Sequence, residues 1–301
     1  MGITAGTFPT SIPMTIKKLP LGLFQLGLCI FYLIFYYFTQ AIDSWAMVGL
    51  TLMELALLII GGSIYLACGG PGQLGHHYQK QDLALALLVP LLIYPILLLC
   101  NGLFLSLLSK FIDLEDASAG FVGNGMGLSV YFFYGLLPAI CEEAFFRGGL
   151  FSYYRQFDER YSLWMTSLLF ALFHFHIQNF VVPFLLGLGL GLLVLRTGKV
   201  MYAMIGHFVA NTAGILFRRS LSTENIAWLR SLGLVQAIGS FEKTLILVLV
   251  LASILSMVVL KLWLGRQIRT ERVVGRGNRE VLLFGSLPLL VVVVFYCVKV
   301  F

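Results

Sequence analysis

The sequence predicts an all-α membrane protein, a polytopic bundle of about 8–9 transmembrane helices. Hydrophobic residues make up 59% of the 301 residues and charged residues only 11%, and the mean hydropathy is +0.93. These values exclude a water-soluble globular domain. Roughly nine apolar stretches reach the length of about 20 residues that a helix needs to cross a bilayer. Because backbone polar groups in lipid must be satisfied within their own segment, these stretches are expected to be helices.

The apolar stretches follow one another along the whole chain, so we expect one integral membrane domain over residues 1–301. Gly187 and Gly191 form a Gly-x-x-x-Gly pattern in one stretch, which favours close packing against another helix. The expected spans, in order, are about 21–41, 46–68, 83–109, 126–148, 162–178, 180–197, 199–217, 243–264 and 281–300.

The basic residues give an orientation. The formal net charge is +6, but Lys and Arg are spread over short connections between spans, which is typical of membrane insertion and argues against nucleic-acid binding. A cytoplasmic N-terminus places most of them inside, although the segment 218–243 fits this orientation poorly. Lys17 and Lys18 directly precede a full-length span, so the first span is expected to be an uncleaved signal anchor.

Few ionisable side chains fall within the expected spans, and each one there is costly unless it is paired or solvated. Glu143 and Arg147 are spaced i,i+4 with the acid first, the favourable order for a helical ion pair. Glu142 is turned about 100° away from that pair. Its carboxylate must find partners on other helices or meet water, which makes Glu142 a candidate general base. Glu54, near the middle of the second span, must likewise pair with a polar helix face or border a water-filled cavity.

Two histidines join these acids. Phe170 and His174 are spaced i,i+4 on the expected span 162–178, so the two rings share a face. His207 and Asn211 repeat this spacing on the span 199–217. A His/Asn pair of this kind can orient a substrate carbonyl, stabilise an oxyanion or bind a metal. For His174 alone, a histidine hydrogen-bonded between helices is about as good an interpretation as a catalytic one.

The spacing also predicts that these residues converge. If a helical hairpin turns near residues 158–160, Glu142 and His174 lie at similar distances on either side of the turn and therefore at similar height. His207 and Asn211 follow Lys199 by about two to three helical turns and reach a comparable depth. Three helices can therefore direct polar side chains at one place.

At these residues the sequence resembles the CPBP family, which includes CAAX proteases and bacteriocin-processing enzymes and is also described as the abortive-infection family of membrane proteins. Three motifs occur in the family's order: Glu142-Glu143-x-x-x-Arg147, Phe170-x-x-x-His174 and His207-x-x-x-Asn211. The likeness covers roughly residues 135–215, and an ordered set of motifs is far more specific than one motif alone.

The resemblance implies an intramembrane endopeptidase that cleaves membrane-anchored, lipidated (CAAX-like) or small secreted peptide substrates, with a catalytic core at about 120–217. It implies that Glu142, assisted by His174, activates water, while His207 and Asn211 polarise the scissile carbonyl. Glu143, Arg147 and Phe170 would then be supporting residues.

Two alternatives stay open. Glu142, His174 and His207 could form a zinc site with an open water position. Asn211 suits an oxyanion donor better than a zinc ligand, so a site without a cofactor is favoured and zinc is the alternative. A non-catalytic bacteriocin-immunity or scaffold protein of the same fold is the runner-up function, and a proton-path transporter that uses Glu54, Glu142 and His207 ranks third.

Overall fold

The helices follow the apolar stretches of the sequence closely. The structure is a computed structural model, and it describes residues 20–41, 46–68, 80–114, 127–220, 240–264, 286 and 288–300. Within these ranges the secondary structure is helical and no strand occurs. The long helices are α1 (Leu21–Ala41), α2 (Ala46–Ala67), α3 (Lys80–Leu108), α7 (Glu159–Leu172), α8 (Val181–Thr197), α9 (Val200–Ser220), α12 (Phe241–Leu264) and α14 (Leu289–Val300).

Five stretches in the described helices are long and apolar enough to cross a membrane: Leu21–Thr39, Met47–Ala67, Gln81–Leu108, Ile177–Thr197 and Val200–Ser220. Helix α12 adds a shorter apolar stretch, Lys243–Val259. The predicted polytopic helical membrane protein is therefore confirmed. The total of eight or nine spans stays a prediction, as does the single domain over residues 1–301.

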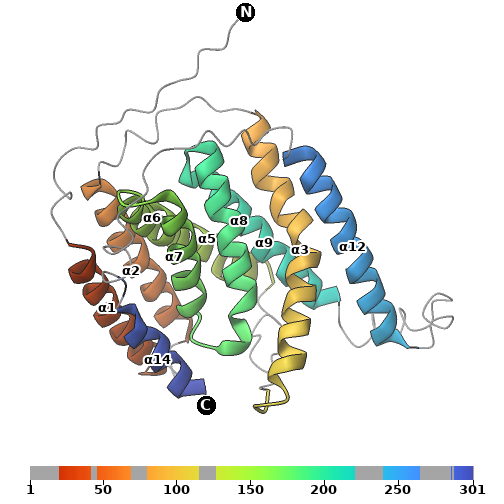
Figure 1. The fold of residues 1–301 in the computed structure, drawn as a ribbon, viewed down its shortest axis with the longest axis horizontal. Helices are drawn as coiled ribbons and strands as arrows, with labels where there is room; N and C mark the ends of the chain where they lie inside the picture. Colours follow the sequence, from red (N-terminus) through yellow and green to blue (C-terminus); the bar gives the residue numbers. More distant parts are fainter. Residues whose placement is uncertain are drawn as a thin grey trace, which may run out of the picture.

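The bundle places the helices in a clear order across its width (Figure 1). Helix α14 lies beside α1 at one side, and α12 packs on α3 at the other. Between them, α2 packs against the segment 137–150, α7 packs on α8, and α9 contacts α3, α8 and the segment 137–143. The middle of the bundle therefore gathers segments that lie far apart in the sequence.

Many apolar side chains point outward from the long helices. Ile34, Ile59, Leu103 and Leu255, on four different helices, are each more than half exposed. In a water-soluble protein such a surface would be an aggregation hazard, whereas lipid solvates it. The outward faces of α1, α2, α3 and α12 therefore suit contact with a bilayer.

Helix α7 ends earlier than the sequence suggested. The predicted helix 162–178 begins at Glu159 and stops at Leu172. Its start is fixed by Asp158, whose side chain accepts a hydrogen bond of 2.7 Å from the Tyr161 amide. Its end is enforced by Phe175, which has a φ of 58°, a left-handed conformation that no right-handed helix can contain. The chain then passes through the short 3₁₀ turn η4 (Ile177–Asn179) into α8.

Small residues permit close helix contacts, as the Gly-x-x-x-Gly pattern predicted. A Cβ atom at Gly187 would lie 3.1 Å from the Cα of Ser167, and one at Gly191 would lie 2.5 Å from Leu163 Cδ1. Helix α8 therefore packs closely on α7. A second such contact joins α2 to the segment 144–150, where a Cβ at Gly61 would lie 2.3 Å from Phe145 Cα.

Candidate active site

The segment that carries Glu142 is one helix of mixed geometry. It runs through α4 (Ser129–Tyr131), η2 (Phe132–Leu136), α5 (Leu137–Glu143), η3 (Ala144–Leu150) and α6 (Phe151–Tyr154), and η2 and η3 are π-helical. The residues at the junctions keep right-handed helical angles, so the helix is continuous. Short π-helical stretches inside α-helices are frequent at functional sites. Glu142 and Glu143 close the α-helical turn between the two.

The predicted ion pair between Glu143 and Arg147 is present. Arg147 Nη1 donates to Glu143 Oε1 at 2.8 Å, and both side chains are fully buried. Arg147 Nη2 also donates to the carbonyl oxygen of Gly187 at 3.0 Å, and its guanidinium lies 4.5 Å from the centre of the Phe170 ring. The arginine therefore ties the π-helical segment to α8 as well as neutralising the acid.

Glu143 has a second partner that the sequence did not reveal. His207 Nδ1 lies 2.9 Å from the same Oε1 atom of Glu143. Because this oxygen already accepts from Arg147 Nη1, it acts as an acceptor, and Nδ1 of His207 carries the proton. The other ring nitrogen, Nε2, then faces Glu142, at 3.9 Å from Oε2.

Glu142 differs from Glu143 in its exposure. Its side chain is 18% exposed, compared with 0% for Glu143. The distance of 3.9 Å between Glu142 Oε2 and His207 Nε2 is too long for a direct hydrogen bond. A water molecule or a substrate atom can bridge two groups at such a separation. The two adjacent glutamates therefore occupy different environments, as their helix positions predicted.

His174 lies beside this pair but not on a helix. It follows Phe173, the residue that ends α7, and belongs to the turn before Phe175. The prediction that placed it on the span 162–178 is wrong by the few residues that the left-handed Phe175 cuts from the helix. Its Nδ1 atom still bonds to the carbonyl oxygen of Phe170 at 2.8 Å, which fixes the ring.

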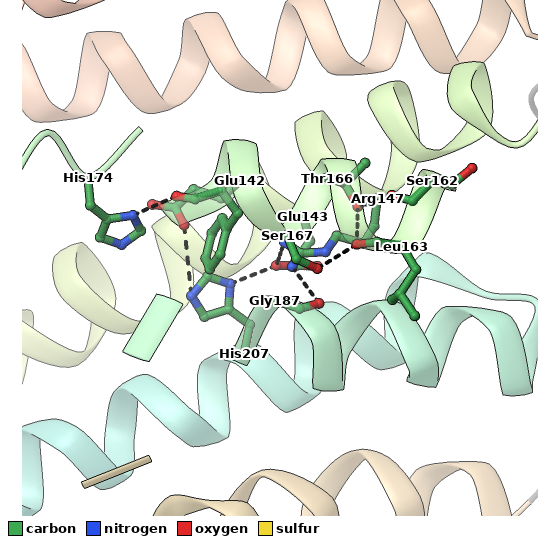
Figure 2. A network of polar contacts seen from close by, with 11 residues as sticks. Glu142, Glu143, Arg147, Ser162, Leu163, Thr166, Ser167, His174, Gly187 and His207 are labelled. Atoms are coloured by element: carbon green, nitrogen blue, oxygen red, sulfur yellow. Dashed lines mark hydrogen bonds and ion pairs between the residues drawn. The ribbon is translucent and has the colours of Figure 1, made fainter. Parts of the chain in front are cut away.

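The Phe170 ring organises the two histidines. Its centre lies 5.1 Å from that of His174 and 5.5 Å from that of His207, each nearly edge to face. In Figure 2 the carboxylate of Glu142 lies between the two imidazole rings. Carbonyl oxygens only accept, so Nδ1 of His174 carries the proton and its Nε2 keeps a free lone pair.

Asn211 is one helical turn beyond His207 on α9, as the spacing predicted, and it is partly exposed. Its amide makes no hydrogen bond with the described residues. The structure thus brings Glu142, His174 and His207 together with Glu143, Arg147 and Phe170. It places Asn211 on the same helix as His207 without a direct contact to the acids.

The side chains of the site also include residue types that bind metals. No group of three or more His, Cys, Asp or Glu among the described residues has the arrangement of metal ligands. His174 and His207 each commit Nδ1 to the protein and leave Nε2 as the remaining donor. Metal-ligating histidines also direct their second ring nitrogen at a carbonyl or carboxylate oxygen, so the contacts of His174 and His207 are compatible with either kind of centre.

The fold and the site define a polytopic helical membrane protein with a buried Glu/His centre. Residues 124–213 match the family model described as Type II CAAX prenyl endopeptidase Rce1-like. The chain therefore carries an Rce1-like domain, and its resemblance to the CPBP family of CAAX-type membrane endopeptidases is confirmed over this stretch. Comparisons with curated proteins and with solved structures gave no match. All seven predicted site residues fall within the matched segment.

Proposed function

We propose that this protein is an intramembrane endopeptidase of the CAAX type, with Glu142, His174, His207 and Asn211 as its catalytic residues. The observation that carries the proposal is that the partly exposed Glu142 carboxylate faces Nε2 of His207 at 3.9 Å, beside His174 (Figure 2). A partly accessible carboxylate facing two fixed imidazoles inside a lipid-embedded bundle suits hydrolysis and has no evident structural purpose.

In this proposal Glu142 removes a proton from a water molecule, and the water oxygen attacks the scissile carbonyl carbon. His174 assists through Nε2, which accepts a hydrogen bond from the same water. Collapse of the tetrahedral intermediate breaks the carbon–nitrogen bond, and the leaving amine takes the proton from Glu142. The products are a new carboxylate and a free amine, so that protons and electrons balance.

His207 and Asn211 would stabilise the oxyanion. For Nε2 of His207 to donate to that oxygen, the ring must carry a second proton, because Nδ1–H is already directed at Glu143. The buried carboxylate of Glu143 stabilises the resulting imidazolium. Glu143 and Arg147 therefore act as positioning residues that set the protonation and the orientation of His207.

The substrates we propose are membrane-anchored, lipidated (CAAX-like) peptides or small secreted peptides. The test uses purified protein in liposomes with three peptides: one carrying a farnesylated cysteine near its C-terminus, the same sequence without the lipid, and a short secreted-type peptide. Mass spectrometry of the fragments should show cleavage of at least one. If the folded protein cleaves none of them, the non-catalytic scaffold or immunity function replaces the enzyme.

A matched pair on α9 tests the role of Asn211 in that assay. Asn211→Ala should lower kcat about 10²- to 10³-fold, the usual loss of an oxyanion donor. Thr212→Val, at the next residue but about 100° around the helix, should leave kcat unchanged. Equal turnover of both variants would remove Asn211 from the site.

We also propose that the N-terminus is cytoplasmic, which places the turn 155–158 inside and the connection 173–180 outside. Arg160 and Asn179 are exposed near these two places. In a cysteine-free background, Arg160→Cys should react with an impermeant thiol reagent added to the cytoplasmic face, and Asn179→Cys with the reagent added outside. The opposite pattern would reverse the orientation.

A further inference from the structure

Glu54 is a buried acid that the site described above does not use. It lies on α2 within the candidate span Met47–Ala67, and only 5% of the residue is exposed. Its Oε2 atom is buried and has no hydrogen-bond partner among the described residues. Burying an unpaired carboxyl group within a membrane span costs several kcal/mol of free energy, so its presence there indicates a functional role.

The contacts of α2 fix the height of Glu54. Met47 Sδ accepts a hydrogen bond of 3.8 Å from Tyr134 Oη, and Gly61 lies against Phe145. Residue numbers increase in the same direction along α2 and along the segment 134–145, so these two helices run parallel. Glu54 is seven residues beyond Met47 and seven before Gly61, which places it about 10 Å from each. Seven residues beyond Tyr134 is Cys141 and seven before Phe145 is Pro138, so Glu54 lies level with the turn 138–141, directly before Glu142.

The packing of the helices agrees with this placement, because α2 packs directly against α5, the helix that carries Cys141 and Glu142. Arg147, the basic residue of the neighbouring segment, is already bound to Glu143 and to the carbonyl oxygen of Gly187. Two carboxyl groups in a low-dielectric environment without a cation between them cannot both ionise, so they share one proton.

We propose that Glu54 and Glu142 form a carboxyl pair in which Glu54 keeps the proton and positions Glu142 and its water. This rests on the proposed function, in which Glu142 must be ionised to act as a base. Glu142 is the ionised member because its side chain is more accessible and faces His207. No direct hydrogen bond joins the two side chains among the described residues, so the protonated Glu54 acts through a water molecule that it holds against the Glu142 carboxylate, and this contact fixes which carboxylate oxygen accepts from the attacking water.

Three variants of α2 test this role through kinetics. Glu54→Leu removes the donor and should lower kcat about 10- to 100-fold, the range seen when an orienting partner is lost, with KM unchanged. Glu54→Gln keeps an N–H donor of similar volume and should restore most of kcat. Ser63→Ala, on the exposed side of α2, is the control and should behave as wild type. Wild-type kcat in Glu54→Leu, or equal losses in the Leu and Gln variants, would overturn the proposal.

Infrared spectroscopy tests the pair without any turnover. The purified protein should show a protonated carboxylic acid band at neutral pH that disappears in Glu54→Gln and persists in Glu142→Gln. If the band disappears only in Glu142→Gln, the proton belongs to Glu142 and the assignment is reversed.

A double-mutant cycle on thermal unfolding provides a second readout that needs no substrate. The shift in Tm of the Glu54→Gln/Glu142→Gln variant should differ from the sum of the single shifts by about 2 °C or more, because substitutions within one hydrogen-bond network are not additive. Additive shifts would separate Glu54 from Glu142 whether or not the protein is a protease. If the two shifts are coupled but no peptide is cleaved, the proposed function fails instead.

Discussion

Two buried polar networks hold this bundle together, and they are built from different chemistry. One is charged and joins Glu143, Arg147, His207 and the Gly187 carbonyl across α5, η3, α8 and α9. The other is neutral and joins α6, α1 and α7. In it Tyr154 donates to Gln25 Oε1 at 3.0 Å, Gln25 Nε2 donates to Tyr161 at 3.2 Å, and Tyr161 lies 2.6 Å from Ser286 Oγ.

The neutral network joins three helices without the desolvation free energy that buried charges require. Burial raises the pKa of the Tyr154 phenol well above its ordinary value, so it remains a neutral donor. Each hydroxyl group of this network can both donate and accept, so the network satisfies its members without a buried charge. Such a network suits a structural role.

The charged network costs more free energy to bury than the neutral one, and it also orients a residue of the proposed site. Burying Glu143 and Arg147 costs several kcal/mol per ion before their attraction offsets it. In return the network fixes His207 with Nε2 directed at Glu142, 3.9 Å away. Of these two networks, the charged one lies next to the proposed reacting groups, and the neutral one joins helices away from them.

The largest effect is expected from breaking the charged network at one residue. Glu143→Gln leaves Arg147 as an uncompensated buried charge, which should lower the free energy of unfolding by about 3–5 kcal/mol. Denaturant unfolding in detergent measures this. The control is Glu159→Gln, which breaks the half-buried pair between Arg155 and Glu159 and should cost about 1 kcal/mol or less. Equal losses would erase the distinction between the buried and the outer ion pair.

Removing both charges separates stability from function. The double variant Glu143→Leu/Arg147→Leu should regain most of the stability, because well-packed apolar residues often replace a buried ion pair without loss. His207 would then lack its Nδ1 partner, and kcat should fall about 10- to 100-fold. Thermal unfolding and peptide cleavage are measured on the same preparation. Full turnover in the folded double variant would show that Glu143 does not position His207.

The neutral network should respond more weakly and without a catalytic effect. Tyr154→Phe leaves Gln25 Oε1 without its donor, and an unsatisfied buried acceptor costs about 1–3 kcal/mol. The expected result is a lower Tm with unchanged kcat per folded molecule. A loss of kcat comparable to that of the Glu143 variants would mean that both networks serve the site.

The smallest effect is expected from chelation. We propose a metal-free centre, so a strong chelator should change neither the Tm nor the cleavage rate. Elemental analysis of the purified protein accompanies the assay. One metal ion per chain that depends on His174 and His207, with activity lost on chelation and restored by metal, would replace this proposal with the zinc alternative.

Much of the fold could be predicted from the lengths of the apolar stretches alone. The bounds of α1, α2, α3 and α8 differ from the expected spans by a few residues at most. The ion pair of Glu143 and Arg147 and the close packing at Gly187 and Gly191 followed from helical spacing, because both depend on positions along one helix. These features are local, and a single sequence contains them.

Features that depend on tertiary contacts did not follow. The π-helical segments and the end of α7 at Leu172 have no clear sequence signal, since Phe175 is a residue type that rarely adopts positive φ. The contact between His207 and Glu143 joins positions 64 residues apart and depends on how α9 packs on α5. The sequence indicated that Glu54 is a buried acid, but its position near Glu142 could be determined only from the contacts of α2.

The most direct test of the proposed chemistry is the turnover of Glu142→Gln. This substitution keeps the volume and the hydrogen-bonding capacity of the side chain but removes the base. The rate of peptide cleavage should fall by about 10²- to 10⁴-fold, the contribution of a general base, while the Tm stays near that of the wild type. Cleavage at the wild-type rate by folded Glu142→Gln would contradict the assignment of Glu142 as the base and, with it, the proposed site.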